Sequence, residues 1–409
     1  MKTAYRAILA LVVLFLAACA AQAPRPKSAS PLILISIDGF RADYFYRGLT
    51  PNLKALADDG VHAKAMRPAF PSLTFPNHYT LVTGLYPDHH GIVNNRFTDP
   101  ASGKKFVYKD ANSTSDPVWW GGEPIWVGAE RQGKHAATMF WPGSNVAIDG
   151  VRPEHWRAFD GKIRPEARVD QVLTWLDLPV AQRPDLVTLY FDAVDHAGHD
   201  HGPDSPEVDD AIAATDRALG HLLDGLRQRG MLDKTNIVVV SDHGMIATEK
   251  DDYVILDDIV DVRDLSIQNL GLLPMFTPKP GHEAAVEKAL IAPHEHMRCW
   301  KKGEMPARLH YGSNPRISPL LCLADPGWLI WTREFVSRPG FFVSKGEHGY
   351  DNADPHMRAL FVASGPAFKR GLVVPEFDNV DVYPLLAKLL GIKPAPNDGN
   401  PATMLEMLQ

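Results

Sequence analysis

Four short, nearly continuous apolar segments divide the chain at wide intervals. They span residues 32–37, 186–191, 237–241 and 359–363. The pattern is not the polar–apolar alternation of a half-exposed strand; it is typical of strands buried on both faces of a parallel sheet. Between them, segments with apolar positions at helical spacing lie at 51–59, 206–229 and 382–390. The pattern predicts an α/β fold with a mostly parallel central sheet flanked by helices.

Potential metal ligands stand beside the ends of these segments. Because ligands of open α/β sheets bind outside the carboxyl ends of strands, we expect these side chains to form one constellation. A single Asp after a strand is usually a turn former or a helix cap, but three such exits together are harder to explain by turns. The set offers oxygen and nitrogen ligands for two adjacent divalent metals, and it contains no thiolate of the kind that closed structural zinc sites use. The residues concerned are Asp38 after the first segment, Asp192, Asp195, His196 and His199 after the second, Asp242 and His243 after the third, and His348 before the fourth.

Thr74 is a candidate nucleophile. Pro76 suits the first turn of a helix, so Thr74 is expected at a helix N-terminus, whose dipole and free N–H groups favour an anion. A hydroxyl bound to a metal at such a place can become an alkoxide at neutral pH. Taken alone, however, the segment favours an ordinary capping threonine.

Seven motifs follow one another along the chain, beginning at Asp38, Thr74, Gly91, Phe140, Asp195, Ser241 and His348. Together they resemble the nucleotide pyrophosphatase/phosphodiesterase family of the alkaline phosphatase superfamily. Their order is the order of that family, and they extend from about Pro31 to the C-terminus. The resemblance implies an alkaline phosphatase-like α/β fold and a hydrolase that cleaves phosphodiester bonds. The motifs are Asp38-Gly39-Phe40-Arg41, Thr74-Phe75-Pro76-Asn77-His78, Gly91-Ile92-Val93-Asn94-Asn95, Phe140-Trp141-Pro142-Gly143-Ser144, Asp195-His196-Ala197-Gly198-His199, Ser241-Asp242-His243-Gly244-Met245 and His348-Gly349-Tyr350-Asp351-Asn352.

The resemblance also implies two zinc ions. One would be held by Asp195, His199 and His348, and the other by Asp38, Asp242, His243 and the Thr74 oxygen. The family pattern Asp-x-x-Gly-His selects Asp195 and His199 over Asp192 and His196, and the His-Gly-x-Asp motif selects His348 over His356. His78 and His201 are expected to support the site or the fold instead of binding metal.

The mechanism implied for such a site begins with attack of Thr74 on phosphorus, which forms a phosphothreonine intermediate. The zinc held by Asp195, His199 and His348 then stabilises the departing oxygen and supplies hydroxide to release the product. Asn95 resembles the family's donor to a non-bridging phosphate oxygen, although a turn residue is the alternative for Asn94-Asn95.

Aromatic residues suggest which phosphate ester is cleaved. Phe75 and Tyr190 match the family's pair that sandwiches a nucleobase, while Trp141 and Phe159 are expected either to line the same pocket or to pack in the core. The substrates would then be nucleotide phosphodiesters or phosphoanhydrides, cleaved to nucleoside 5′-monophosphates. A choline-phosphodiester or lysophospholipid phosphodiesterase of the same superfamily is the alternative. A zinc-binding envelope lipoprotein without turnover is a third, and Thr74 argues against it because metal storage requires no nucleophile.

Composition and charge exclude several other classes. With 45% hydrophobic and 22% charged residues among 409, the chain is not disordered, collagen-like or a coiled coil. Its formal net charge is −7 and it has no long basic run, so a stable nucleic-acid complex is not expected. The oligomeric state cannot be inferred from the sequence.

The first residues are expected to direct export. Lys2 and Arg6 precede an apolar stretch, residues 7–18, that is shorter than the roughly 20 residues needed to span a bilayer. Leu16-Ala17-Ala18-Cys19 resembles a bacterial lipoprotein signal, which predicts a signal peptide over 1–18, lipidation of Cys19 and a tether over 19–30. The alternative is a plain signal cut after Ala23. Both place the protein in the periplasm or cell envelope, and the first adds a membrane tether.

The catalytic core is expected to be interrupted. Residues 31–250 and 342–409 would form it, and residues 251–341 would form an inserted small α/β subdomain. The insertion contains Cys299 and Cys322, which we expect to be disulfide-bonded because the compartment is oxidising.

Overall fold

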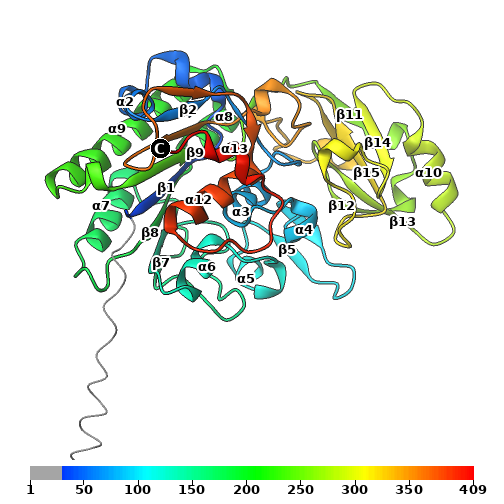
Figure 1. Ribbon diagram of the computed structural model, residues 1–409. Helices are drawn as coiled ribbons and strands as arrows, with labels where there is room; N and C mark the ends of the chain where they lie inside the picture. The colour runs from blue at the N-terminus through cyan, green and yellow to red at the C-terminus, as the bar shows by residue number, and fades with distance from the viewer. Residues whose placement is uncertain (1–29) are drawn as a thin grey trace, which may run out of the picture.

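An eight-stranded sheet lies at the centre of the computed structural model, which describes residues 30–409 (Figure 1). All neighbouring strands are parallel except where β18 lies antiparallel to both β9 and β2. The sheet is therefore mixed but mostly parallel, and the predicted α/β fold is confirmed. Its strands in spatial order are β19 (Leu372–Val374), β2 (Val61–Ala63), β18 (Phe361–Ser364), β9 (Asn236–Val240), β1 (Leu32–Ile37), β8 (Leu186–Phe191), β6 (Ala136–Met139) and β7 (His155–Arg157).

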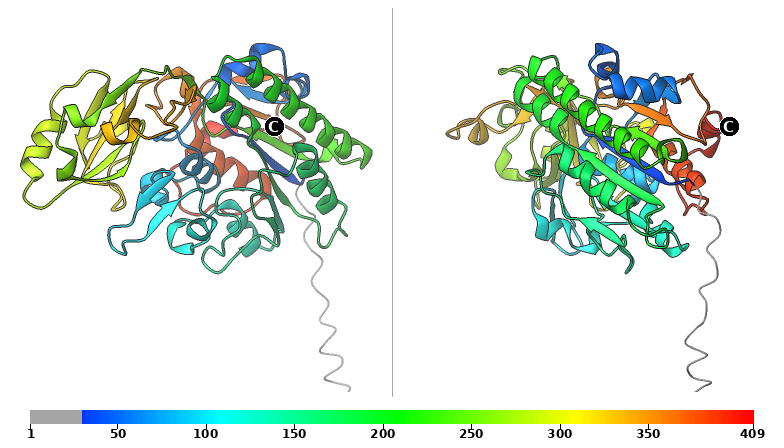
Figure 2. Two further views of the ribbon diagram at one scale, coloured as in Figure 1. Left: turned by 180° about the vertical axis from the view of Figure 1, so that it is seen from behind. Right: turned by 90° about the vertical axis from the view of Figure 1, so that its left-hand side faces the viewer.

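Helices cover both faces of this sheet (Figure 2). In β1, Ile33 and Ile35 pack with one helical layer, whereas Leu32 and Leu34 pack with the other. Both faces are thus apolar, which explains why the strand segments do not alternate polar with apolar residues. The first layer contains α2 (Pro51–Asp58), α7 (Pro165–Leu176) and α9 (Pro206–Gln228), and the second contains α3 (Thr74–Thr83), α6 (Ile125–Arg131) and α12 (Val382–Leu390).

Helix α9 shows how local sequence fixes an element. The Ser205 side chain caps its N-terminus by accepting from the Val208 N–H, and Pro206 occupies its first turn. Farther along α9, the buried Asp216 carboxylate accepts hydrogen bonds from the backbone N–H groups of Asn52 (3.1 Å) and Leu53 (2.9 Å). Asp216 therefore caps α2, whose own N-cap residue makes no side-chain bond. The predicted helices at 51–59, 206–229 and 382–390 are confirmed to within one residue.

The direction of β18 matters for the site. Because β18 runs opposite to β9, the chain that enters it lies at the edge of the sheet where β1, β8 and β9 end. Part of that chain, β17 (Gly346–Glu347), pairs antiparallel with β10 (Ile246–Ala247), which follows β9. This pairing brings His348 to the end of β9.

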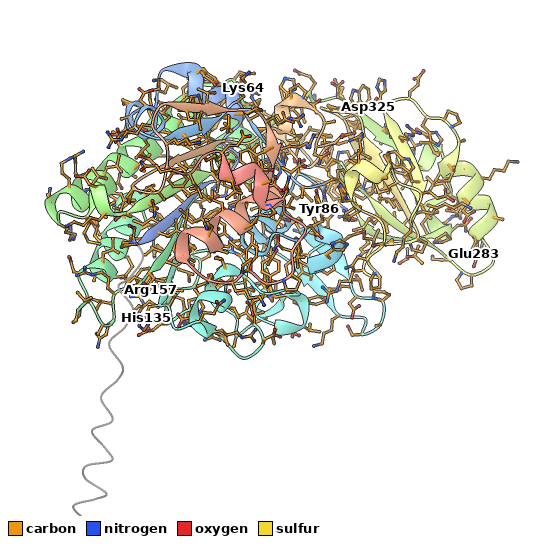
Figure 3. All side chains as sticks on the ribbon, viewed as in Figure 1. Lys64, Tyr86, His135, Arg157, Glu283 and Asp325 are labelled. Carbon is orange, nitrogen blue, oxygen red and sulfur yellow. A yellow bond between two sulfur atoms is a disulfide. The ribbon has the colours of Figure 1, made fainter. Side chains whose placement is uncertain are left out.

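A second sheet lies beside the core, at the right of Figure 1. Its spatial order is β12 (Leu265–Asn269), β13 (Met275–Pro278), β15 (Leu320–Ala324) and β14 (Met297–Lys301), with α10 (Glu283–Ile291) packed against β14. These elements all lie within residues 251–341, and the division of the chain into a core and an inserted subdomain with these limits stays a prediction. In Figure 3, Asp325 and Glu283 lie in this part of the molecule, at the opposite end from His135 and Arg157 of the core.

Polar contacts dock the insertion on the core. The Asp88 carboxylate of the core accepts from the backbone N–H groups of Gly312 (3.1 Å) and Ser313 (2.6 Å). The hydroxyl of Tyr311 donates to the carbonyl of Val93 at 2.8 Å.

Shorter elements complete the described chain. They are β3 (Met66–Arg67), α4 (Pro87–His90), β4 (Arg96–Thr98), β5 (Lys105–Val107), α5 (Ala111–Thr114), α8 (Ala193–His201), β11 (Tyr253–Ile255), β16 (Leu329–Trp331), α11 (Arg333–Val336), β20 (Phe377–Asp378) and α13 (Pro401–Leu405), together with single turns of 3-10 helix. Across residues 30–409, no helix combines the length and the apolar character needed to cross a bilayer. The expected signal peptide over 1–18, Cys19 and the tether up to residue 29 lie outside the described residues.

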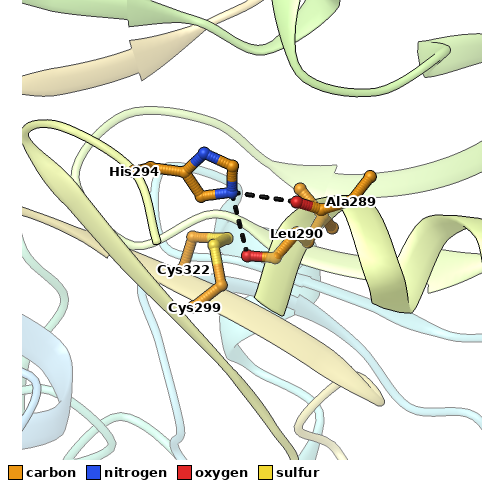
Figure 4. The surroundings of a disulfide bond; sticks show 5 residues. All are labelled: Ala289, Leu290, His294, Cys299 and Cys322. Carbon is orange, nitrogen blue, oxygen red and sulfur yellow. Dashed lines mark hydrogen bonds between the residues drawn. A yellow bond between two sulfur atoms is a disulfide. The ribbon is translucent and has the colours of Figure 1, made fainter. Parts of the chain in front are cut away.

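Cys299 and Cys322 form a disulfide between β14 and β15, where they are directly paired (Figure 4). Close by, His294 donates from Nε2 to the carbonyls of Ala289 (2.9 Å) and Leu290 (3.2 Å) near the end of α10. The disulfide thus joins the neighbouring strands β14 and β15, and His294 caps the C-terminal end of α10.

Removing the disulfide should destabilise the protein. The bond closes a segment with a sequence separation of 23, for which loop-closure entropy predicts a loss of about 3 kcal/mol in the free energy of unfolding. We expect the double variant Cys299→Ala/Cys322→Ala to show this loss in chemical denaturation. Its amide exchange, compared with the wild-type protein, should be accelerated more in β14 and β15 than in β1. Unchanged stability and unchanged exchange would contradict the expectation.

Candidate active site

The ends of three parallel strands supply most of the candidate ligands. Asp38 directly follows β1, Asp242 and His243 follow β9, and α8 begins immediately after β8. Asp195 and His199 lie one turn apart on α8, so they face the same side. Asp195, His199 and His243 contact His348 at this edge of the sheet.

The first group contains Asp195, His199 and His348. Asp195 Oδ1 lies 3.5 Å from Nε2 of both histidines, and the two Nε2 atoms are 3.2 Å apart. Asp195 and His348 are buried, while His199 is partly exposed. Among these three residues, His199 is therefore the one that solvent reaches most.

The second group lies beside the first and includes the candidate nucleophile. His243 Nε2 is 3.4 Å from Asp38 Oδ1 and 3.0 Å from Asp242 Oδ2. Thr74 is the first residue of α3, as the sequence predicts, and its Oγ1 lies 3.2 Å from the same His243 nitrogen. The rings of His243 and His348 stack at 3.5 Å, which joins the two groups.

Backbone carbonyls orient the three imidazoles. Nδ1 of His199 donates to the carbonyl of Gly346 (2.7 Å), that of His243 to Gly244 (2.9 Å) and that of His348 to Ser72 (2.9 Å). A histidine that donates from Nδ1 carries a free lone pair on Nε2 when it is neutral. The three Nε2 lone pairs consequently point into the cluster, which is the usual arrangement of histidine ligands.

The carboxylates in the cluster need a positive partner. Asp38 Oδ1, Asp195 Oδ1 and Asp242 Oδ2 are buried, and within residues 30–409 none has a hydrogen-bond donor in bonding geometry. Two donor atoms about 2.1 Å from one tetrahedral ion lie roughly 3.4 Å apart, close to the 3.0–3.5 Å spacings found here. The residues present therefore fit divalent metal ions.

Burial and mutual repulsion set the pKa values of the carboxyl groups. Burial raises the pKa of Asp38 well above its usual value, and the neighbouring carboxylates of Asp242 and Asp195 add to this effect. Burial would also raise the pKa of Asp242, but nearby His243 and His78 outweigh it and hold that pKa well below its usual value. Uneven charge stabilisation thus leaves Asp38 as the carboxylate that most needs another cation.

The histidines differ in the same way. Burial, together with the stacked His243, lowers the pKa of His348 to about 3, so its imidazole is neutral at pH 7 and offers a lone pair. Burial opposes charge on His199 and His243 as well, but the carboxylates of Asp195 and Asp242 raise the pKa of both. Metal binding must displace any protons held there.

Two residues make supporting contacts whose partners the sequence did not indicate. The hydroxyl of Tyr190 donates to Asp38 Oδ2 at 2.6 Å, although only its ring was assigned a role. His78 is buried, with Nε2 2.8 Å from the Ser36 hydroxyl and Nδ1 2.9 Å from the Thr74 carbonyl and 3.2 Å from Asp242 Oδ2. A polar Ser36 inside an apolar strand was the available signal for the second contact.

Alternative ligands lie outside the cluster. Asp192 accepts a hydrogen bond from Arg168 at 2.8 Å, and the side chain of His196 is 66% exposed. His356 contacts Asp354, and His201 is nearest to Glu207. The structure thus brings together the ligand set implied by the resemblance and leaves these alternatives apart.

The residues expected to bind substrate differ in how far their side chains are exposed to solvent. The Phe75 ring is partly exposed, and the backbone N–H of Phe75 donates to Asn95 Oδ1 at 3.1 Å. Phe159 is 57% exposed and meets Tyr190 edge to face at 5.8 Å. Trp141 is only 4% exposed and donates to the carbonyl of His78, so its burial favours the core-packing alternative.

The fold and this centre define an α/β protein with a candidate metal site beside a hydroxyl at a helix N-terminus. The sequence profile of the family described as "Type I phosphodiesterase / nucleotide pyrophosphatase" matches residues 32–351. The chain belongs to this family, whose members are enzymes.

Individual relatives support the assignment. The chain is 41% identical over 381 residues to a Schizosaccharomyces pombe protein named as a pyrophosphatase/phosphodiesterase, covering 90% of this chain and 79% of that protein. It is 39% identical over 399 residues to ectonucleotide pyrophosphatase/phosphodiesterase family member 1 of Mus musculus, covering 95% of this chain but 44% of the relative. The chain thus spans less than half the length of that animal protein, and both relatives are eukaryotic.

A solved relative confirms the fold. Murine ectonucleotide pyrophosphatase/phosphodiesterase 5 superposes with a TM-score of 0.88 at 33% identity, covering 93% of this chain and 100% of that chain. The same murine protein has also been solved as an inactive threonine-to-alanine variant in complex with AMP.

Removing metal should lower the melting temperature. An ion that binds only the folded state stabilises it by about 2.7 kcal/mol when its free concentration is 100 times Kd. We therefore expect a chelator to lower the Tm of purified protein and a divalent ion to restore it. His199→Gln should greatly reduce this metal-dependent change, whereas His196→Gln, its exposed neighbour on α8, should keep it. Equal behaviour of the two variants would contradict the ligand assignment.

Proposed function

We propose that this protein is a two-zinc phosphodiesterase and pyrophosphatase that cleaves nucleotide substrates to nucleoside 5′-monophosphates. The observation that carries the proposal is the Thr74 hydroxyl, which lies at the first residue of α3 and 3.2 Å from His243 in the ligand cluster. A helix N-terminus attracts an anionic phosphate to this hydroxyl. A capping role alone would not require neighbouring metal ligands.

Zinc suits the donor set. Neutral imidazole nitrogens and carboxylate oxygens without thiolate are typical of catalytic zinc sites. Asp195, His199 and His348 would hold one ion. Asp38 and Asp242, which both lie beside His243, would hold the other with that histidine and the Thr74 oxygen. When bound, the ions supply Lewis-acid chemistry, because they neutralise developing charge on the phosphate and lower the pKa of a nearby hydroxyl.

Thr74 then acts as the nucleophile. Its hydroxyl attacks phosphorus, the bond from phosphorus to the bridging oxygen of the leaving group breaks, and the threonine proton leaves with that oxygen. The nucleotide is left on Thr74 as a phosphothreonine diester. Water subsequently attacks phosphorus and releases the nucleotide, with a proton returned to the Thr74 oxygen. His78 keeps the helix end in place, since it contacts the Thr74 carbonyl and the Asp242 carboxylate.

A hydrogen bond of Asn95 supports a role for this residue in the attack. Its Oδ1 is occupied by the Phe75 N–H, so its amide NH2 is the part left to donate to a non-bridging phosphate oxygen. Such a donor is typically worth about 2.7–4 kcal/mol in the transition state.

The aromatic residues and the relatives support nucleotide substrates. Phe75 and Phe159 have exposed ring surface, which suits a stacked nucleobase. Tyr190 contacts both Phe159 and the candidate metal ligand Asp38. The names of the relatives refer to nucleotide pyrophosphatases, and AMP binds one of them. A choline-phosphodiester or lysophospholipid substrate is the competing assignment because the same metal centre could serve it.

A variant and a substrate panel test the proposal together. Thr74→Ala should reduce kcat/KM by at least about 1,000-fold, because removing a nucleophile typically removes most of the rate enhancement, while the metal-dependent change in Tm persists. Zinc-loaded wild-type protein should prefer ATP, a dinucleotide and a nucleotide p-nitrophenyl diester over glycerophosphocholine and a phosphate monoester. Full activity of Thr74→Ala would refute the mechanism, and a preference for glycerophosphocholine would refute the substrate.

We also propose that the enzyme works in the periplasm or cell envelope, anchored through a lipid on Cys19. The charged start at Lys2 and Arg6, the apolar stretch over 7–18 and the following Cys19 support this location. A disulfide between Cys299 and Cys322 agrees with an oxidising compartment.

Expression in a bacterium that processes lipoproteins tests the anchor. The wild-type protein should be found in the membrane fraction and incorporate labelled fatty acid, whereas Cys19→Ser should do neither. A wild-type chain that is exported in soluble form and begins after Ala23 would instead establish the plain secretory signal.

A further inference from the structure

One buried arginine connects three segments near the candidate metal ligands and the aromatic residues Phe159 and Tyr190. Arg168 lies on α7 with a side chain that is 2% exposed. Its Nε donates to the carbonyl of Ile163 at 2.8 Å, and one terminal nitrogen donates to the Tyr190 carbonyl (2.9 Å) and to Asp192 Oδ1 (2.8 Å).

The three segments carry different parts of the site. Phe159 and Ile163 lie in the segment between β7 and α7, and Tyr190 lies near the end of β8. Asp192 is the N-cap residue of α8, on which Asp195 and His199 stand. A single guanidinium group thus fixes the aromatic residues relative to the helix that bears the candidate metal ligands.

The guanidinium also supports the aromatic rings directly. Its central carbon lies 5.1 Å from the ring centre of Phe140 and 6.0 Å from that of Phe159, within reach of cation–π attraction. Phe140 meets Phe159 at 5.2 Å, and Phe159 meets Tyr190 at 5.8 Å, both edge to face. Phe159 is 57% exposed, so its ring orientation depends on its contacts with Phe140, Tyr190 and Arg168.

We propose that Arg168 is a positioning residue that determines specificity for the nucleoside part of the substrate. Arg168 sets the distance between the aromatic pair Phe159–Tyr190 and α8. When a base stacks on this pair, the phosphate attached to the nucleoside then lies beside the Thr74 hydroxyl. This inference rests on the proposed nucleotide function and adds to it the element that selects nucleotide over base-free diesters.

Lysine cannot replace arginine here. A guanidinium reaches Ile163 from Nε and Tyr190 and Asp192 from its end, whereas an ammonium group has donors at one point only. Arg168→Lys therefore keeps the charge beside Asp192 but loses the tie to the segment that carries Phe159.

The matched control is Arg229→Lys. Arg229 also bonds a carboxylate, that of Asp177, and a backbone carbonyl, that of Gly225. Asp177 is the C-cap residue of α7, whereas Arg168 lies in the first turns of the same helix. The control thus makes the same substitution at the end of α7 away from Arg168.

The experiment compares two substrates with the same leaving group, thymidine 5′-p-nitrophenyl phosphate and methyl p-nitrophenyl phosphate. For Arg168→Lys we expect KM for the thymidine ester to rise about tenfold, as for the loss of part of one base-stacking contact. Its kcat for that ester and its kcat/KM for the methyl ester should stay within about twofold, and Arg229→Lys should change neither substrate. The metal-dependent change in Tm should be retained in both variants.

A second background tests whether Arg168 acts through the ring. In Phe159→Ala, adding Arg168→Lys should raise KM for the thymidine ester by less than half of the factor seen in the wild type, because the two changes affect one unit. Fully multiplying effects would overturn the proposal.

Other outcomes separate the two proposals. If the wild-type protein prefers the thymidine ester but Arg168→Lys slows both esters equally or loses the metal-dependent change in Tm, the positioning role is refuted and the nucleotide function stands. If the wild-type protein shows no preference, both are refuted. If Arg168→Lys does not fold, Asp192→Asn, which weakens the same anchor without adding volume, must lower the preference for the thymidine ester at least about twofold, and an unchanged preference refutes the role.

Discussion

Three buried carboxylates at one edge of a sheet impose the main constraint on this protein. Asp195 lies beside His199 and His348, whereas Asp38 and Asp242 lie beside His243, and each carboxylate has an oxygen without a donor in residues 30–409. Burying such charges is costly unless cations and hydrogen bonds compensate. The fold supplies rigid strand ends, carbonyls that orient the imidazoles and a helix N-terminus, so that metal ions can complete the compensation.

The antiparallel β18 is the part of the architecture that closes this centre. A wholly parallel sheet would bring the chain into each strand at the edge away from the ligands. With β18 reversed, the preceding segment passes along the ligand edge, and the β10–β17 pairing delivers His348 against His243. One reversed strand therefore lets residues more than a hundred positions apart share one metal site.

The sequence was sufficient to predict features that depend on local pattern. Strand β1 and helix α9 could be recognised because apolar spacing acts within a few positions. The choice of Asp195 over Asp192 came from the resemblance to the family, because each of these aspartates is followed by a histidine four residues later. The reversed direction of β18, the hydroxyl of Tyr190 on Asp38 and the three bonds of Arg168 could not be read in this way. They are contacts between segments distant in sequence, and a residue type alone does not say which partner it will meet.

Tyr190 belongs to two environments at once. Its ring lies against Phe159 and His78, while its hydroxyl donates to Asp38 Oδ2. A ligand that favours this ring orientation also favours the carboxylate orientation that suits a cation. Thermodynamic linkage then requires the cation to strengthen binding of that ligand by the same factor. The Phe159–Tyr190 pair and the candidate metal centre are in this sense linked through a single phenol.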